Sequence, residues 1–341
     1  MSRFVNNDLT AFEKTVIDSV RSQYVLQYPG GDPDSLHWET TRKGDSRSLF
    51  LFYSKREGPT FFAKCSSTQQ LTFGNEFDML SGLKRNNAVA NSVPEVTALI
   101  EDGDCSAIVE KAADGFLFPP VRLLQFWERR IVRSRIRSVL SWWKVLVESS
   151  RVRDQNNTVP ARVELVREAL LKCYGPTGLY SRCQGVLNRV AEFGAGTPVL
   201  SVVHGDLWRE NILLRRDGIL VLDWERAENL GLPLLDFLLF LSTLIDDSTQ
   251  TGFVRVFFAE NWLSESVRDC LNEACEFLGL SRSQAEDLFF FFLCIMSSQG
   301  MRLSGRHMEW DSNWRARLDV AMKNRESVSL LFGKLAEESR N

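Results

Sequence analysis

The sequence predicts an α+β protein with a strand-rich N-terminal part and a mainly helical remainder. Between residues 36 and 111, short apolar runs of strand length alternate with turn residues. After residue 120, longer segments with apolar residues at helical spacing predominate. A short strand and a hairpin between residues 199 and 223 interrupt these helices, and the loop between them is rich in polar residues.

The strand-rich part follows an expected helix and a break in the chain. Residues 6–8, Asn-Asn-Asp, can cap a helix from about Leu9 to Tyr24, and the Pro-Gly-Gly-Asp-Pro sequence at residues 29–33 ends that segment. One helix is expected from Gly74 onward. Five strands are expected, at residues 36–41, 48–54, 60–64, 96–100 and 107–110.

The composition is that of an ordinary globular protein and argues against several classes of partner. Of 341 residues, 44% are hydrophobic and 25% charged, and the net charge of −3 is unlike that of a general nucleic-acid-binding protein. The seven cysteines include no CxxC pair, which favours reduced thiols in a cytoplasmic protein. The chain start lacks an apolar signal core, and the apolar run at residues 288–296 is too short to cross a bilayer. Neither secretion nor membrane insertion is therefore expected.

The stretch from Ser201 to Glu225 combines a polar loop with a predicted hairpin. The loop reads HGDLWREN, and two apolar runs then flank the turn at residues 215–218. Because a hairpin brings its two ends together, we expect Asp206, Asn211 and Asp223 to converge. Two carboxylates and an amide oxygen suit Mg²⁺ with a phosphate attached, or one carboxylate stays free to accept a proton from a hydroxyl group.

HGDLWREN followed by VLDWE resembles the catalytic and metal-binding loops of the aminoglycoside phosphotransferase family. The sequence is also similar to fructosamine kinase and choline kinase relatives, and Leu207-Trp208 resembles the fructosamine-type loop. The resemblance implies a bilobal protein-kinase-like fold, with a small antiparallel-sheet N-lobe and a mainly helical C-lobe. It also implies that Asp206 is the catalytic base that orients and deprotonates an acceptor hydroxyl, and that Asn211 and Asp223 bind Mg²⁺.

Two further positions match the family's handling of the nucleotide phosphates. Lys64 ends an apolar strand, where in isolation it would be a lysine with its charge at the surface. The resemblance instead implies that Lys64 holds the α- and β-phosphates of ATP and pairs with a carboxylate on the next helix. Glu76, twelve residues further on, is the expected partner, since Asp78 should project from another side of that helix.

Two loops complete the expected nucleotide site. The turn at residues 42–47 contains Gly44 and Ser46, and it is either a plain hairpin turn or a cradle for phosphates. The segment from Val109 to Ala112 matches the family's hinge, where backbone groups hold adenine, so Glu110 and Ala112 are expected at the nucleotide.

A basic segment at residues 121–144 admits three interpretations. At helical spacing, Arg130, Arg133, Arg137 and Lys144 share one face, and apolar residues such as Ile131 lie towards the other. A solvated basic edge over a core face is favoured over a site for an anionic substrate or partner, and over contact with an anionic membrane surface.

Other polar and aromatic residues receive structural interpretations. Asp236 resembles the family's structural acid that accepts backbone hydrogen bonds from the catalytic loop. It could equally be an ordinary helix N-terminal acid, and the two interpretations are compatible. The resemblance implies that His204 supports the loop's backbone rather than acting as a base. The histidines at 37 and 307 are taken as structural, and the tryptophans at 310 and 314 as core residues in preference to an acceptor cleft.

The sequence thus predicts an ATP- and Mg²⁺-dependent enzyme that transfers the γ-phosphate to a hydroxyl of a small molecule of the aminoglycoside, sugar or amino-alcohol type. The expected parts are an N-terminal helical extension (1–35), an N-lobe (36–111), and a C-lobe (112–341) with the catalytic loop, the metal site and the acceptor-binding helices. A non-catalytic nucleotide-binding scaffold and transfer of AMP on the same fold are the alternatives.

Overall fold

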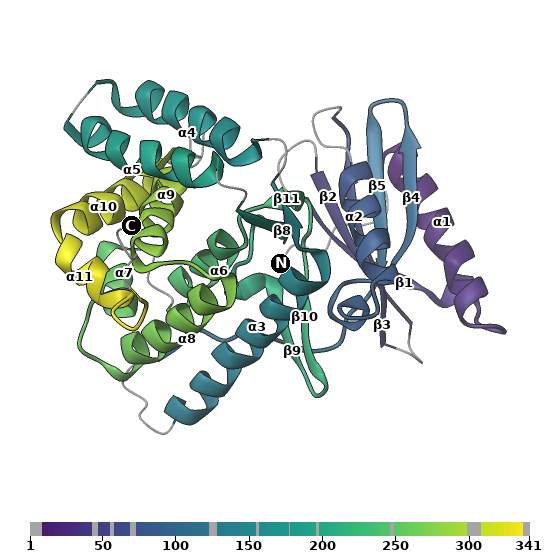
Figure 1. The fold of residues 1–341 in the computed structure, drawn as a ribbon. Coiled ribbons are helices and arrows are strands. Elements are labelled where there is room, and N and C mark those ends of the chain that lie inside the picture. The colour runs from purple at the N-terminus through teal and green to yellow at the C-terminus, as the bar shows by residue number, and fades with distance from the viewer. Residues whose placement is uncertain are drawn as a thin grey trace. The chain divides into compact units, whose positions relative to one another are not determined.

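The chain forms two compact units in the computed structural model (Figure 1). We call Met1–Leu117 with Ile212–Ala227 the sheet unit, and Phe118–Asn211 with Glu228–Asn341 the helical unit. The structure describes residues 9–42, 47–54, 58–68, 73–122, 128–154, 157–176, 178–195, 198–245, 249–298 and 308–336.

The sheet unit is built on a five-stranded antiparallel sheet in the order β1-β2-β3-β5-β4. Each strand pairs with its neighbour in the antiparallel sense. The strands follow the order of the chain except that β5 lies between β3 and β4. All five predicted strands are present. Their bounds are His37–Arg42 for β1, Arg47–Ser54 for β2, Gly58–Ser66 for β3, Val96–Asp102 for β4 and Cys105–Lys111 for β5.

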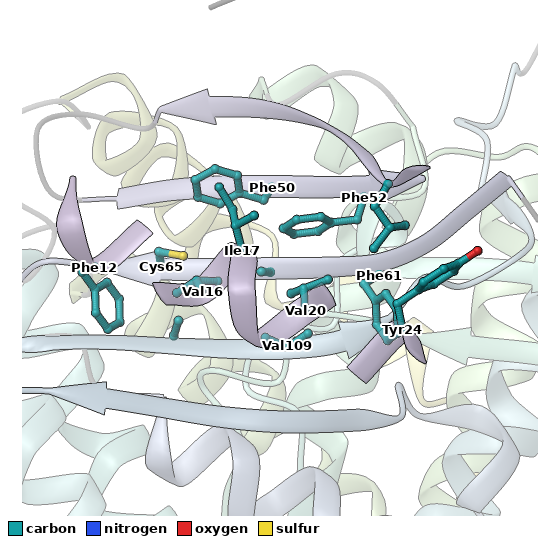
Figure 2. Packing of buried hydrophobic residues seen from close by; sticks show 13 residues of the cluster. Phe12, Val16, Ile17, Val20, Tyr24, Phe50, Phe52, Phe61, Cys65 and Val109 are labelled. Carbon is teal, nitrogen blue, oxygen red and sulfur yellow. The ribbon is translucent and has the colours of Figure 1, made fainter. Parts of the chain in front are cut away.

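Helix α1 (Ala11–Gln27) packs on one face of this sheet. Figure 2 shows its apolar side chains, among them Val16 and Val20, against Phe50 of β2, Phe61 of β3 and Val109 of β5. Side chains alternate along a strand. The residues immediately before and after each residue that contacts α1 therefore project from the other face of the sheet. Lys64, between Ala63 and Cys65 of this cluster, therefore lies on the face away from α1.

The start of α1 differs from the expectation. Thr10 is the N-cap, because its hydroxyl accepts from the Glu13 N–H at 3.1 Å while the Glu13 carboxylate accepts from the Thr10 N–H at 2.8 Å. This reciprocal capping box fixes the helix start two residues later than predicted. The expected cap at residues 6–8 lies outside the described residues.

Two further parts complete the sheet unit. Helix α2 (Gly74–Arg85) buries Glu76 together with Met79, Leu80 and Leu83. A three-stranded sheet has the order β10-β9-β6, with β6 at Phe116–Leu117, β9 at Ile212–Arg215 and β10 at Gly218–Val221. The predicted hairpin is therefore confirmed, with Arg215 opposite Gly218 at its turn. Short 3₁₀ helices lie at Pro33–Ser35 and Ala90–Ser92.

The helical unit surrounds a small sheet of order β11-β8-β7. Its strands are β7 (Val152–Arg153), β8 (Val199–Val203) and β11 (Glu228–Gly231). Helix α9 is buried from Leu288 to Ser298, so the apolar run at residues 288–296 is part of a core helix. The helices are α3 (Arg129–Ser150), α4 (Thr158–Tyr174), α5 (Gly178–Ala195), α6 (Pro233–Ser242), α7 (Gln250–Phe257), α8 (Trp262–Leu278), α9 (Arg282–Ser298), α10 (Met308–Lys323) and α11 (Arg325–Leu331).

The basic side of α3 contacts another helix rather than solvent alone. Arg129 and Arg133 both lie within 3.5 Å of Glu265 on α8, and Lys144 lies 2.6 Å from Glu273 on the same helix. These acidic partners balance part of the positive charge that the sequence placed on this face. No described helix is both long and apolar enough to cross a membrane.

One detail of the predicted α3 faces is wrong. Ile131 was expected towards the core but is 51% exposed. The buried stripe runs through Val132, Ile136, Val139 and Trp143, and the predicted core residues Val139 and Trp142 are both buried. Its 3.6-residue repeat continues to Leu146 and Val147, and this leaves Ile131 on the rim.

Together the two units give a mixed α+β chain with an antiparallel sheet in its N-terminal region and helices in its C-terminal region. The predicted fold class is confirmed.

Candidate active site

A buried lysine gathers three acidic side chains in the sheet unit. Lys64 of β3 is 6% exposed, and its Nζ donates to Glu76 Oε1 at 2.6 Å and to Asp223 Oδ1 at 2.8 Å. Glu110 Oε1 lies 4.0 Å from the same nitrogen. The expected Lys64–Glu76 pair is therefore present, while Asp78, its competitor in sequence, is exposed.

The charge balance of this cluster is unequal, with one ammonium among three carboxyl groups. Burial raises the pKa of Glu110 to about 7, although the charge of Lys64 opposes the rise. Burial also raises the pKa of Glu76 against the pull of Lys64. For Lys64, burial acts to lower the pKa, but the carboxylates of Glu110, Glu76 and Asp223 outweigh it and raise the pKa. The lysine thus stays charged and can face an anionic group.

Two buried carboxyl oxygens of the cluster lack a hydrogen-bond partner among the described residues. They are Glu76 Oε2 and Glu110 Oε1. Buried polar atoms are normally satisfied, and unsatisfied ones gather at functional sites or where a solvent molecule or ligand completes them. The side chain of Glu110 was missed by the sequence analysis, which expected only its backbone to matter.

Asp223 has an unusual backbone. Its φ is +64°, and the only other non-glycine residue among those described with positive φ is Asn157. Trp224 fixes this turn, because its N–H donates to Glu76 Oε1 at 3.0 Å and its indole N–H donates to the Val221 carbonyl at 2.8 Å. Strained conformations of this kind persist where the surroundings enforce them. Trp224 therefore aims Asp223 at Lys64, a role that its sequence position alone did not reveal.

A second ion pair lies beside the expected phosphate turn. Arg47 at the start of β2 pairs with Glu225, and its guanidinium lies 5.9 Å from the ring centre of Phe73. Sequence reasoning missed both partners, since they are far apart in the chain. Gly44 and Ser46 lie outside the described residues, so their contact with phosphate stays a prediction.

Two backbone N–H groups of the expected hinge at the end of β5 already donate to carbonyls within the sheet unit. The Ala112 N–H donates to the Thr60 carbonyl at 2.9 Å, and the Lys111 N–H donates to the Glu95 carbonyl at 2.8 Å. A nucleotide base at this edge would therefore need other backbone groups. Those of the exposed Ala113 are next along the chain.

Asp236 binds the backbone of the polar loop in the helical unit. This residue, in the first turn of α6, accepts the N–H groups of His204 at 2.5 Å and Gly205 at 2.9 Å. Burial raises the pKa of Asp236 to about 7, and the two backbone hydrogen bonds act in the opposite sense. The interpretation as the acid that supports the loop is confirmed. His204 Nδ1 in turn accepts the N–H of Asp206 at 3.2 Å, as expected for a structural histidine.

Asp206 and Asn211 sit at the two ends of a tight loop. Asn211 Nδ2 donates to the Asp206 carbonyl at 2.9 Å, which leaves the amide oxygen of Asn211 to face elsewhere. The Trp208 indole N–H donates to Asp206 Oδ1. One oxygen of the expected catalytic carboxylate is therefore oriented by Trp208, a contact that the sequence analysis did not anticipate.

The donor set fits Mg²⁺ and a nucleotide in its chemistry. Asp223, with a 38% exposed side chain, and the amide oxygen of Asn211 are hard oxygen ligands of the kind Mg²⁺ prefers. Within the described ranges, no group of three or more His, Cys, Asp or Glu side chains could hold a metal ion. The expected convergence of Asp206, Asn211 and Asp223 joins residues of different units, and it stays a prediction.

Of the remaining candidates from the sequence, Trp314 is confirmed as structural. Trp314 is 1% exposed and packs edge-to-face on Phe292 at 5.6 Å, so it is a core residue. His37 is exposed beside Tyr53. His307 and the side chain of Trp310 lie outside the described residues.

Comparisons with known proteins place this geometry in context. A model of the phosphotransferase enzyme family matches residues 140–270, which include the Asp206 loop, Asp223 and Asp236. No curated protein sequence matches the chain.

Three solved structures share the fold over most of the chain. A choline kinase from Cryptosporidium parvum has a TM-score of 0.59 at 13% identity, covering 92% of this chain and 96% of its own. The GDP complex of a mutant aminoglycoside 2'-phosphotransferase-IIIa has a TM-score of 0.52 at 13% identity, covering 91% and 99%. A putative fructosamine-3-kinase from Thermobifida fusca has a TM-score of 0.52 at 16% identity, covering 89% and 99%.

At such identities the structural likeness shows the fold alone, and the family match supplies the enzyme class. The predicted resemblance to the aminoglycoside phosphotransferase family is confirmed, and with it the prediction that the chain is an enzyme of the small-molecule kinase class.

Proposed function

We propose that the protein transfers the γ-phosphate of ATP, with Mg²⁺, to a hydroxyl group of a small molecule. The observation that carries the proposal is Lys64, a buried ammonium bound to both Glu76 and Asp223. Burying an ammonium costs free energy unless anionic groups surround it. Phosphate oxygens are suitable partners in addition to these two carboxylates. Seven free cysteines support action in a reducing compartment such as the cytoplasm.

Each unit would contribute a different part of the reaction. Lys64 of the sheet unit would hold the α- and β-phosphates, and Glu76 would keep its ammonium in place. Asp223 and Asn211 would hold Mg²⁺, which when bound neutralises charge on the phosphates.

Asp206 would act on the acceptor. Its carboxylate accepts the hydroxyl proton while the acceptor oxygen bonds to the γ-phosphorus. The bond between the γ-phosphorus and the β,γ-bridging oxygen breaks, and that oxygen leaves with ADP. The Trp208 indole N–H donates to Oδ1 of Asp206 and so orients the carboxylate that would receive the proton. Phosphoryl transfer needs positioning and charge neutralisation more than covalent help, so one base and the metal ligands suffice.

The direct test is the substitution of Asp206. We expect Asp206→Ala to reduce transfer by a factor of about 10² or more, because the base is lost, while calorimetry still detects ATP binding. Mass spectrometry of acceptors after incubation with ATP or GTP measures the product; both nucleotides are used because one structural neighbour was solved with GDP. A fully active Asp206→Ala enzyme would contradict the assigned role.

The same measurement separates the alternatives. A product heavier by one phosphate supports kinase action, one heavier by a nucleotide supports AMP transfer, and bound ATP with no product supports a scaffold. The joint presence of Lys64, Asp206, Asn211 and Asp223 favours the kinase, since each is a group that the reaction needs.

A further inference from the structure

A small cavity of the helical unit begins at the residue before Asp206. It has a volume of about 40 Å³ and is bounded by Gly205 and by side chains from α6 and α9. Gly205 is in the cavity wall, and the Cα of Asp206 follows that of Gly205 by about 3.8 Å. The cavity is thus a candidate site for the part of an acceptor next to its reacting hydroxyl.

The walls of this cavity are mostly apolar. Leu235 and Leu239 of α6 and Phe292, Ile295 and Met296 of α9 face it. About 10–15 Å³ of such space holds one water-sized group, so the cavity has room for about three heavy atoms. A small hydrocarbon group, of the size of an isopropyl group, matches both the volume and the lining.

Two charged residues, Asp236 and Arg162, line the cavity, and only Arg162 has N–H groups that could bind a ligand. Asp236 is committed to the backbone N–H groups of His204 and Gly205. Arg162 of α4 uses Nη1 for Glu228 at 2.5 Å, and its side chain is 27% exposed. A guanidinium carries five N–H donors and binds carboxylates in a planar fork, so Arg162 can bind a second anion.

This lining is unfavourable for a cationic acceptor. An ammonium group next to the reacting hydroxyl would meet apolar walls or the like charge of Arg162, and Asp236, the acid in the lining, already accepts two backbone N–H groups. An anionic group would meet Arg162 at the rim while an apolar group filled the cavity.

We propose that the acceptor is a small hydroxy acid, with its hydroxyl at Asp206, a short hydrocarbon group in the cavity between α6 and α9, and its carboxylate on Arg162. This inference rests on the proposed phosphotransfer and names the class of its substrate. The site belongs to the helical unit alone, so it does not depend on how the nucleotide is bound.

Four matched probes test the proposal with the full chain and ATP. They are 2-hydroxy-3-methylbutanoate, the amino alcohol 2-amino-3-methylbutan-1-ol, the neutral 3-methylbutane-1,2-diol, and glycolate, which lacks the hydrocarbon group. We expect phosphorylation of 2-hydroxy-3-methylbutanoate with a kcat/KM at least tenfold above that of the diol, and a further loss for the amino alcohol. Equal or better use of the amino alcohol, or of kanamycin, overturns the proposal.

Two substitutions assign the recognition to the cavity. Arg162→Gln should lower kcat/KM for the hydroxy acid about tenfold and leave the diol unchanged, whereas a merely structural arginine would affect both equally. The control is Arg167→Gln on the same helix, since Arg167 contacts Glu164 and Asn188 outside the cavity. Met296→Phe, which fills the cavity, should impair the branched probes and spare glycolate. A thermal melt verifies that each variant is folded, and Met296→Ala, which enlarges the cavity, should instead favour longer hydrocarbon groups.

Calorimetry on Asp206→Asn keeps this inference separate from the proposed function. Binding of 2-hydroxy-3-methylbutanoate to Asp206→Asn that is weakened by adding Arg162→Gln supports the acceptor site even if the wild-type protein transfers no phosphate. Absence of transfer by the wild-type protein counts against phosphotransfer alone. Absence of such binding in a protein that phosphorylates another alcohol overturns the acceptor class and retains the kinase.

Discussion

The sheet unit and the helical unit hold their key acidic residues in opposite ways. In the sheet unit, Asp223 is held by contact between side chains, because Lys64 reaches it from a strand far away in sequence. In the helical unit, Asp206 is held by a short loop whose backbone bonds to Asp236, His204 and Asn211. The first arrangement depends on charge balance and the second on peptide geometry. Substitutions should therefore affect stability in the first unit and activity in the second.

The largest expected effect comes from removing the central charge of the sheet unit. Lys64→Met leaves three acidic groups without their cation, so we expect a loss of about 3–5 kcal/mol of unfolding free energy together with loss of ATP binding. Urea denaturation and calorimetry measure the two effects. The matched control is Lys111→Met, which breaks the partly exposed pair with Glu95 and should cost about 1 kcal/mol or less. Equal losses of unfolding free energy in both variants would contradict the prediction that burial makes the Lys64 cluster more important for stability than the exposed pair.

The pH dependence of stability sharpens the comparison. The pKa of Glu110 is raised to about 7 in the folded protein, so the native state binds this proton more tightly than the unfolded chain does. The stabilisation is complete below about pH 4.5 and is lost as the pH rises through 7, with a total of up to about 3 kcal/mol. Glu110→Gln should flatten this decline, as measured by urea midpoints between pH 5 and 8. Glu95→Gln is the control, and a wild-type slope in Glu110→Gln would refute the assignment.

The smallest expected effect concerns the helical unit. Trp208→Phe removes the hydrogen bond that orients Asp206, so we expect kcat to fall about tenfold with ATP affinity unchanged, equivalent to about 1.4 kcal/mol of barrier. A change in the acidic limb of the pH–rate profile should accompany it. Trp143→Phe is the matched control, because its indole N–H donates to the buried Pro233 carbonyl, and it should lower stability without changing that profile. Identical profiles for wild type and Trp208→Phe would contradict the orienting role.

Local patterns in the sequence were sufficient for the strands, the hairpin and the catalytic loop. Apolar runs and turn residues predict these elements, and the spacing from Lys64 to Glu76 allows a strand, a short loop and the first turn of a helix. The capping of α1 was misplaced because several polar residues near its start are equally good caps, and only the reciprocal bonds of Thr10 and Glu13 decide between them.

Contacts between distant segments were not accessible in this way. The burial of Glu110 beside Lys64 follows from strand register, which places both on the face opposite α1. The pair of Arg47 and Glu225 joins residues 178 positions apart, and no local signal links them. Trp208 stood within the recognised loop, but its indole could have pointed in several directions, so its bond to Asp206 required coordinates.

The packing of α1 on β3 makes the chain intolerant of small insertions at one place. Phe61, Ala63 and Cys65 face α1, and Lys64 faces the opposite side. One residue added between Phe61 and Lys64 would turn the ammonium into the apolar layer or force the aromatic ring out of it, whereas two added residues would restore the facing of both. The alternation of side chains that buries apolar residues against α1 thus also determines which positions of β3 can carry charge on the other face of the sheet.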